Sequence, residues 1–248
     1  MNNVNDTYFD GYYKDIWRNM IPEQLTVKEV EFMVEYFQLK PGSKVLDLMC
    51  GYGRHAIALA EKGISVTAVD NLVQYIDQVK NLVEGTSLPI KAIREDVLNY
   101  VPDEKFDLVL CMGNSLNFFN EADTRMLLSK VNDCLATDGY LLIHSWSILE
   151  IVVKTFNPQS SSKIGDIEMD TTTEFLFQPT RVEAETKMTM SNGDIEIKKG
   201  VDYVFCISEY EHMLLDSGLS LENFYSIPGK KVFTIGEPRI YIIAKKQS

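Results

Sequence analysis

Short apolar runs alternate with segments of helical periodicity through the first half of the chain, and this alternation restricts the fold more than any other feature. The runs are apolar throughout, which is typical of strands buried on both faces. The strand candidates are residues 44–49, 64–69, 90–93, 106–112 and 140–144, and the helix candidates are residues 24–38, 54–62, 72–84 and 121–136. Such a pattern predicts an α/β fold with a doubly wound, mostly parallel sheet.

The pattern changes in the second half. Residues 170–208 are rich in Thr and Val and alternate with period two, and Asn192-Gly193 within them is a strong hairpin signal. We expect an antiparallel insert at about residues 165–207, placed after the fifth strand as a cap on one domain. The elements expected beyond it are a helix at residues 208–216 and two strands at residues 219–226 and 232–244.

Acidic residues outnumber basic ones by a wide margin. The chain has 36 Asp and Glu against 24 Lys and Arg, which gives a formal net charge of −12. Nucleic-acid binding needs clustered Lys and Arg for counterion release, and anionic lipid also attracts basic surfaces. We therefore expect neither a nucleic acid nor a membrane as partner.

The few cysteines and histidines show no spacing that indicates a site. The four cysteines form no C-x-x-C pair, and the three histidines include no pair at a helical ligand spacing. Neither a disulfide framework nor a metal site is expected. The N-terminus lacks signal-peptide regions, and no apolar run is long enough to cross a bilayer. These features predict a reduced, cytoplasmic protein with one domain, residues 1–248.

A glycine turn joins the first strand candidate to the helix after it. Gly51 and Gly53 allow backbone conformations closed to other residues and let a ligand approach the chain closely. The helix that follows presents free N–H groups at its start. Parallel sheets bind ligands beyond the carboxyl ends of their strands, where this turn lies. By itself the turn also fits a dinucleotide site.

Acidic residues at three successive strand ends sharpen this prediction. Asp47 precedes the glycines, Asp70 closes the second strand, and Asp96 with Val97 follows the third. A carboxylate at the second position can accept from two ribose hydroxyls, and one at the third can accept from an exocyclic amine. Any one of them alone would more simply be a polar residue that starts a loop. Together they predict a nucleoside site.

These motifs resemble those of the class I S-adenosylmethionine-dependent methyltransferases. The segments that carry the resemblance are VLDLMCGYGRHA (45–56), AVD (68–70), EDV (95–97), FDLVLCMGNSLNFF (106–119), DGYLLIHSW (138–146) and RIYIIAKK (239–246). The resemblance implies a seven-stranded sheet whose final strand is antiparallel. It also implies S-adenosylmethionine as cofactor and methyl transfer as the activity. Residues 113–117 lack the Asn/Asp-Pro-Pro-aromatic pattern, which with the acidic charge favours a small-molecule acceptor with an oxygen or nitrogen nucleophile.

The resemblance also implies which residues hold the cofactor. Asp47 would interact near the amino end of the methionine moiety, Asp70 would hold the ribose, and Asp96 with Val97 would hold the adenine. Met49 stands where the family has its first glycine, so its backbone would approach the cofactor less freely. The full set of candidates is Tyr13, Asp47, Met49, Gly51, Gly53, Asp70, Asn71, Asp96, Val97 and Met112.

Two residues are candidates for catalysis. His144, at the end of the fifth strand, would act as a base or orient the acceptor, or else be a histidine satisfied by local backbone. Tyr13 lies in an aromatic N-terminal segment. Residues 1–40 would form a helical lid, with the Tyr13 hydroxyl reaching the donor or the acceptor, or would dock on the core.

The insert and the whole chain also leave alternatives open. The inserted strands would roof the acceptor pocket or pair with a second copy, so the protein is expected to be a monomer or a homodimer. An NAD(P)-dependent oxidoreductase is the runner-up activity, although Asp47 and the long lead-in before the glycine turn favour the methyl donor. A nucleoside-binding sensor without catalysis is the other alternative.

Overall fold

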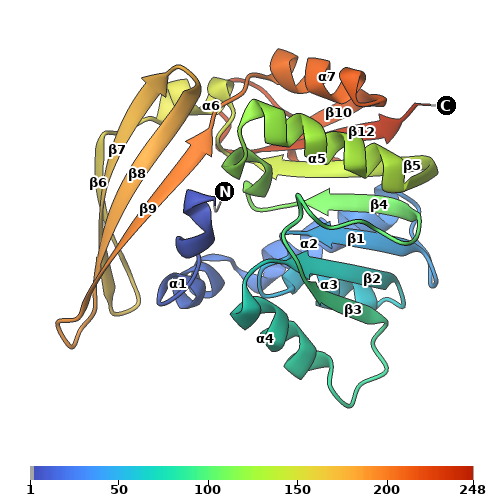
Figure 1. Ribbon diagram of the computed structural model, residues 1–248, viewed down its shortest axis with the longest axis horizontal. Coiled ribbons are helices and arrows are strands. Elements are labelled where there is room, and N and C mark those ends of the chain that lie inside the picture. Colours follow the sequence, from blue (N-terminus) through green and yellow to red (C-terminus); the bar gives the residue numbers. More distant parts are fainter. Residues whose placement is uncertain (1–2, 248) are drawn as a thin grey trace.

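The computed structural model describes residues 3–247 and contains two separate sheets (Figure 1). The larger sheet has eight strands in the order β11-β10-β12-β5-β4-β1-β2-β3. Its strands are β1 (Lys44–Leu48), β2 (Ser65–Asp70), β3 (Ile90–Arg94), β4 (Phe106–Cys111), β5 (Leu135–Ser145), β10 (Leu219–Ile227), β11 (Lys231–Val232) and β12 (Ile240–Lys246). The strands from β3 to β5 are mutually parallel, and β12 runs antiparallel between β5 and β10.

Strand side chains alternate between two hydrophobic cores, one on each face of this sheet. In β4, Leu108 and Leu110 pack into one core, whereas Val109 and Cys111 pack into the other. This follows from the period of two along an extended chain, and it explains why the run from Leu108 to Cys111 is apolar at every position. The doubly wound α/β fold predicted from the sequence is thereby confirmed.

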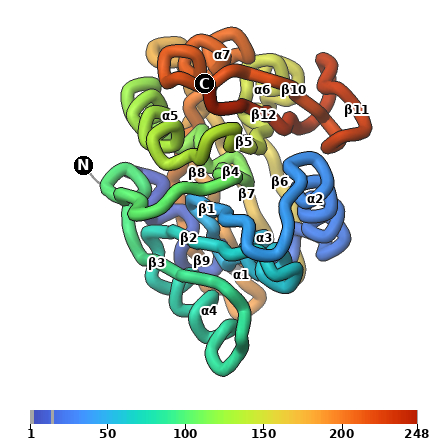
Figure 2. The backbone as a smooth tube through the Cα atoms, turned by 90° about the vertical axis from the view of Figure 1, so that its right-hand side faces the viewer, coloured from blue at the N-terminus to red at the C-terminus, as the bar shows by residue number. Residues whose placement is uncertain are grey.

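Helices cover both faces of the sheet. On one face, the helices that pack into the core are α5 (Glu121–Cys134), α6 (Leu149–Thr155) and α7 (Ile207–Asp216). On the other face they include α2 (Glu23–Tyr36) and α3 (Arg54–Ala60). The remaining helices are α1 (Tyr13–Met20), α4 (Val73–Val83) and the short 3-10 turns η1 (Val4–Thr7) and η2 (Ser115–Phe118). Figure 2 shows β3 and β11 at opposite edges of the sheet.

The C-terminal strands correct two details of the sequence analysis. The sheet has eight strands because the two-residue β11 pairs with β10, where seven strands were expected. The strand expected at residues 232–244 is wrong in its first part, since β12 begins only at Ile240. Residues 233–239 form a connection because β11 and β12 lie on opposite sides of β10, so the chain must cross from one side of β10 to the other.

The insert forms the second sheet, with four antiparallel strands. They are β6 (Gln159–Ile164), β7 (Ile167–Phe177), β8 (Thr180–Thr189) and β9 (Ile195–Tyr203). The hairpin turn at Asn192-Gly193 joins β8 to β9 as predicted. The insert starts earlier than residue 165, because β6 was not foreseen in a segment that reads QSSSKI.

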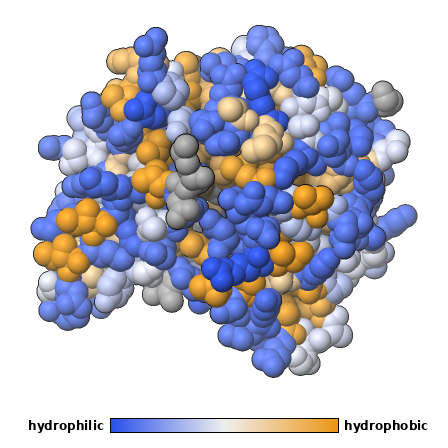
Figure 3. Space-filling model, in the orientation of Figure 1, coloured by the Kyte–Doolittle hydropathy of each residue, from blue (hydrophilic) through white to orange (hydrophobic). Residues whose placement is uncertain are grey.

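The N-terminal segment lies between the two sheets (Figure 1). In the face shown in Figure 3, hydrophilic residues predominate, and hydrophobic ones gather around a hollow between the sheets. No helix within residues 3–247 is long and apolar enough to span a membrane. Within the same residues, no cluster of three or more His, Cys, Asp or Glu side chains is arranged to hold a metal ion.

Candidate active site

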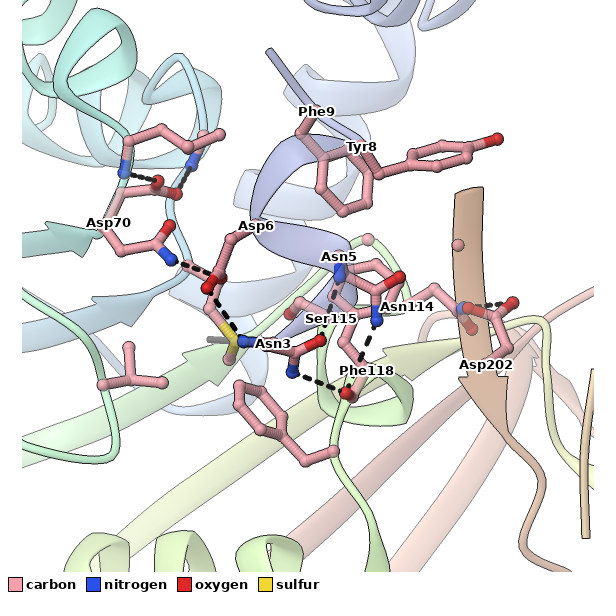
Figure 4. A pocket seen from close by; sticks show the side chains of 18 of the residues that line it. Asn3, Asn5, Asp6, Tyr8, Phe9, Asp70, Asn114, Ser115, Phe118 and Asp202 are labelled. Carbon is pink, nitrogen blue, oxygen red and sulfur yellow. Dashed lines mark hydrogen bonds between the residues drawn. The ribbon is translucent and has the colours of Figure 1, made fainter. Parts of the chain in front are cut away.

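A cavity of about 550 Å³ lies where the carboxyl ends of the parallel strands meet the second sheet. One wall comes from the loops after β1, β2, β3 and β4, and the opposite wall comes from β8 and β9. The N-terminal segment from Asn3 to Trp17 contributes a third wall. The cavity is therefore lined by parts of the chain that lie far apart in sequence (Figure 4).

The glycine turn forms one end of the cavity and is tied to the second strand. The backbone N–H of Gly51 donates to Asp70 Oδ2 at 2.9 Å, and the N–H of Leu72 donates to Asp70 Oδ1 at 2.9 Å (Figure 4). Met49 has a φ of 56°, a left-handed conformation usual for glycine. Met49 thus adopts a backbone conformation that a glycine would favour at this position.

The two glycines of the turn have different surroundings. A Cβ atom added to Gly51 would meet nothing within 4 Å, and Gly51 lines the cavity. A Cβ atom added to Gly53 would lie 2.6 Å from Val79 Cγ2, and Gly53 caps α3 instead of lining the cavity. Gly51 leaves room for a ligand, whereas Gly53 leaves room for α4.

Asp47 and Asp70 are buried carboxyl groups in the cavity wall. Asp47 is 2% exposed, and its Oδ2 accepts no hydrogen bond from any described residue. Burial raises the pKa of Asp47 to about 7 and that of Asp70 to about 6. A buried carboxylate oxygen without a partner is costly, so Asp47 is set to accept from a cationic or hydrogen-bonding ligand.

The other cofactor candidates also line the cavity. Asp96, Val97 and Met112 do so from the loops after β3 and β4, and Asn71 donates through Nδ2 to Asp6 Oδ1 at 2.6 Å. The structure therefore brings together nine of the ten residues predicted for the cofactor and leaves out Gly53.

Tyr13 lies in a cluster of aromatic rings in the cavity wall. Its ring meets Tyr8 edge to face at 4.7 Å and stacks on Trp17 at 6.4 Å. Burial raises the pKa of Tyr13 well above the ordinary tyrosine value, so the hydroxyl stays protonated at neutral pH. Tyr13 can donate a hydrogen bond, but it cannot act as a phenolate base there.

His144 lies behind the cavity wall, and it is not among the described residues that line the cavity. Its Nδ1 accepts from the N–H of Gly113 at 3.3 Å, its ring stacks on Tyr241 at 4.4 Å, and its Nε2 has no partner among the described residues. Burial lowers the pKa of His144 to about 3. The expected role as a base on the acceptor therefore has no geometric support, because Gly113 separates the ring from the cavity.

A buried network beside His144 was not foreseen. Glu29 Oε2 accepts from Arg54 at 2.6 Å and from His55 Nε2 at 2.9 Å, and its Oε1 accepts from the Tyr241 hydroxyl at 2.6 Å. Burial alone would raise the pKa of Glu29, but His55 and Arg54 hold it well below its usual range. Glu29 lies on the apolar face of a helical pattern, where a single polar residue gives little signal.

Asn114 connects the loop after β4 to the second sheet. Its Oδ1 accepts from Ser145 Oγ and from the N–H groups of Trp146 and Ser147, each at 3.0 Å. Its Nδ2 donates to Ser147 Oγ at 3.0 Å and to Asp202 Oδ2 at 3.2 Å. Asp202, on β9, was missed because a single acidic residue in an alternating strand looks like an ordinary solvated position.

Part of the chain is similar in sequence to known methyltransferases. Residues 45–139 match the family model described as a methyltransferase domain. Over 55% of its length the chain is 28% identical to the glycine/sarcosine N-methyltransferase of Aphanothece halophytica. The chain spans about half the length of that relative, 52%.

Two solved structures are similar over nearly their whole length. The CcbJ methyltransferase of Streptomyces caelestis has a TM-score of 0.83 at 13% identity, with 98% of each chain covered. An S-adenosylmethionine-dependent methyltransferase of Clostridium acetobutylicum has a TM-score of 0.80 at 18% identity, covering 95% of this chain and 96% of that one. The chain therefore has the fold of S-adenosylmethionine-dependent methyltransferases, and residues 45–139 match a methyltransferase domain.

Proposed function

We propose that this protein transfers the methyl group of S-adenosylmethionine to a nitrogen or oxygen atom of a small-molecule acceptor. The observation that carries this proposal is the cavity that joins the glycine turn on one side to the second sheet on the other. Its volume of about 550 Å³ falls within the range of small-molecule pockets.

The cofactor would lie along the carboxyl ends of β1, β2 and β3. Asp70 would accept from the ribose hydroxyls, Asp96 would accept from the adenine amine, and Asp47 would accept from the amino group of the methionine moiety. The unpartnered Oδ2 of Asp47 supports this placement, since an ammonium group would supply its missing donor. The bound sulfonium supplies an activated methyl group.

Alignment and exclusion of water are the work left to the protein. A methyl donor that is already activated mainly needs its nucleophile held in line, so a shaped pocket can replace a fixed set of catalytic residues. In this proposal residues 1–40 act as a lid and residues 165–207 as a substrate cap. Hydrogen bonds between the N-terminal segment and the second sheet support that view. Asn5 donates through Nδ2 to the carbonyl of Val201 and accepts through Oδ1 from the N–H of Val201, each at 2.9 Å.

Calorimetric titration with S-adenosylhomocysteine tests the cofactor part, with NADH as the parallel control. We expect micromolar binding of S-adenosylhomocysteine and none of NADH. Tight NADH binding instead would support the oxidoreductase and contradict the proposal.

Turnover tests the transfer part. The protein is incubated with methyl-labelled S-adenosylmethionine and a panel of small amines and alcohols, and labelled product is measured. Binding of S-adenosylhomocysteine without any labelled product would favour a nucleoside-binding sensor.

A further inference from the structure

One carboxylate that lines the cavity comes from the second sheet, whereas those proposed to hold the cofactor come from the ends of β1, β2 and β3. Asp202 lies on β9 and lines the cavity beside Asn114, which belongs to the loop after β4 (Figure 4). Its Oδ2 accepts from Ser147 Oγ at 2.7 Å and from Asn114 Nδ2 at 3.2 Å. Its Oδ1 accepts no hydrogen bond from a described residue. One oxygen is therefore fixed by the protein, and the other is left for a ligand.

Among the described side chains, no cationic group acts on Asp202. Only burial and its hydrogen bonds to Ser147 and Asn114 shift its pKa. The titratable groups that respond to its charge are the phenols of Tyr8, Tyr13 and Tyr210, all with raised pKa values, so they stay neutral. A carboxylate held in place without a counter-ion needs a cationic partner more than a surface carboxylate does.

The rest of the cavity has the same preference for positive charge. The aspartates that line it are Asp6, Asp47, Asp70, Asp96, Asp123 and Asp202. Arg54 is the lining residue of opposite charge within the described chain, and Glu29 already engages it. Aromatic rings such as those of Tyr8 and Trp146 also line this side, and their faces attract ammonium groups.

From this arrangement we infer that the acceptor is an amine, and that Asp202 binds its ammonium form and takes its proton. The inference rests on the proposed function. Asp202 Oδ1 accepts a proton from R–NH₃⁺, which leaves R–NH₂ and a neutral carboxylic acid. The nitrogen lone pair then forms the N–C bond to the methyl group while the C–S bond breaks and its electron pair returns to sulfur. The products are R–NH₂⁺–CH₃, S-adenosylhomocysteine and a proton that Asp202 passes to solvent.

The acidity of Asp202 suits this role. Burial raises its pKa to about 6, against the lowering effect of Ser147 and Asn114. A base works best when its pKa lies near the working pH, and Asp202 is ionised above about pH 6 while a simple amine is still protonated. We expect kcat/KM for an amine acceptor to rise as the pH increases through about 6.

The two tryptophans of the chain make the test direct. Trp17 and Trp146 both line the cavity, so intrinsic fluorescence reports its occupancy. The complex with S-adenosylhomocysteine is titrated with matched pairs of probes: 2-phenylethylamine and 2-phenylethanol, glucosamine and glucose, and glycine and glycolate. We expect at least one amine to bind about tenfold more tightly than its hydroxyl partner.

The variant Asp202→Asn keeps an oxygen that can accept from Ser147 and Asn114 but removes the charge. We expect it to weaken amine binding about tenfold and to leave binding of the alcohol and of S-adenosylhomocysteine within about twofold. Glu185→Gln is the matched control, because Glu185 is an exposed carboxylate on the neighbouring strand that pairs with Lys199. It should change none of these affinities.

The pH profile separates a chemical role from a structural one. Asp47 and Asp70 have raised pKa values in the same range, so kcat/KM is measured at saturating S-adenosylmethionine in wild type and variant. Only a limb that disappears with Asp202→Asn belongs to Asp202. If that variant does not fold, the wild-type preference for amines and its pH profile decide the matter.

Each outcome separates this inference from the proposed function. Loss of S-adenosylhomocysteine binding in the wild-type protein contradicts the proposed function itself. If S-adenosylhomocysteine still binds, three results contradict only the role of Asp202. These are equal binding of amines and alcohols, no binding of any amine, and an Asp202→Asn variant that behaves like wild type. In that case Asp202 merely anchors β9 to Asn114.

Discussion

The two walls of the cavity are built in different ways. The cofactor wall uses strand ends that follow one another in sequence, from Asp47 to Val97, and its turn is tied to Asp70 through backbone N–H groups. The wall proposed to bind the acceptor, called the acceptor wall below, joins Asn5, Asn114 and Asp202, which come from three distant parts of the chain. The first wall is determined locally by β-strand geometry, and the second depends on side-chain hydrogen bonds between distant segments.

This difference predicts which parts tolerate change. Parallel strands place their carboxyl ends at one edge whatever the loops do, so the cofactor wall persists when the rest of the domain varies. The acceptor wall depends on the Asn114 side chain, because four of its hydrogen bonds fix it to residues 145–147 and the fifth reaches Asp202 on β9. Variants in the two walls should therefore affect different ligands.

The largest expected effect comes from Asp70→Ala. The variant loses the carboxylate proposed to hold the ribose, together with the two backbone hydrogen bonds that fix the turn. We expect the affinity for S-adenosylhomocysteine, measured by calorimetry, to fall about 100-fold, or close to 3 kcal/mol.

Asp77→Ala is the control for that variant, because Asp77 is an exposed aspartate on α4. It should bind S-adenosylhomocysteine as the wild-type protein does. The division between the walls breaks down if Asp70→Ala keeps full affinity, or if Asp202→Asn loses as much affinity for S-adenosylhomocysteine as Asp70→Ala does.

Much of the fold could be predicted because apolar runs and helical periods report burial directly. β4 reads FDLVLC and is buried on both faces, so its pattern leaves little choice. β6 reads QSSSKI, and nearly all of it is exposed at the edge of the second sheet. Its place follows from pairing with β7, which a local pattern does not contain.

The candidate site could likewise be predicted only where its residues stand at recognisable positions in the sequence pattern. Asp47 and Asp70 stand at recognisable strand ends, whereas Asp202 gains its meaning only from Asn114, 88 residues away. For His144 the sequence left two readings open, because its residue type suggests titration near neutral pH, whereas a local backbone partner would suit a structural role. Its burial against Tyr241 is a property of packing between β5 and β12, so no local signal revealed that it lies behind the wall.

The second prediction compares the two glycines of the turn. Gly51 and Gly53 both have left-handed backbones, with φ values of 55° and 78°, so alanine strains either one by about 1 kcal/mol. Only Gly53→Ala also forces a contact with Val79. We expect Gly53→Ala to lower the free energy of unfolding by at least about 2 kcal/mol, measured in urea.

Gly51→Ala should show the opposite balance. Its Cβ would point into open space in the cavity, so stability should fall by only about 1 kcal/mol while affinity for S-adenosylhomocysteine falls about tenfold. Equal loss of stability in the two variants would show that the space beside Gly51 is not reserved for a ligand.

The smallest effect is expected from His144→Gln, which tests whether His144 takes part in the reaction. The pKa of His144 is about 3 in the folded protein and about 6.5 in an unfolded chain. Between these values the unfolded chain binds a proton that the folded protein does not, so the free energy of unfolding falls as the pH decreases below about 6.5. Between pH 7 and pH 6 this contribution is about 0.7 kcal/mol, and His144→Gln should remove it from the urea-unfolding profile. Because Gly113 separates the ring from the cavity, kcat for an amine acceptor should stay within about twofold of wild type. A large fall in kcat, together with the expected loss of pH dependence in stability, would contradict this expectation. It would show that His144 takes part in the reaction although it lies behind Gly113.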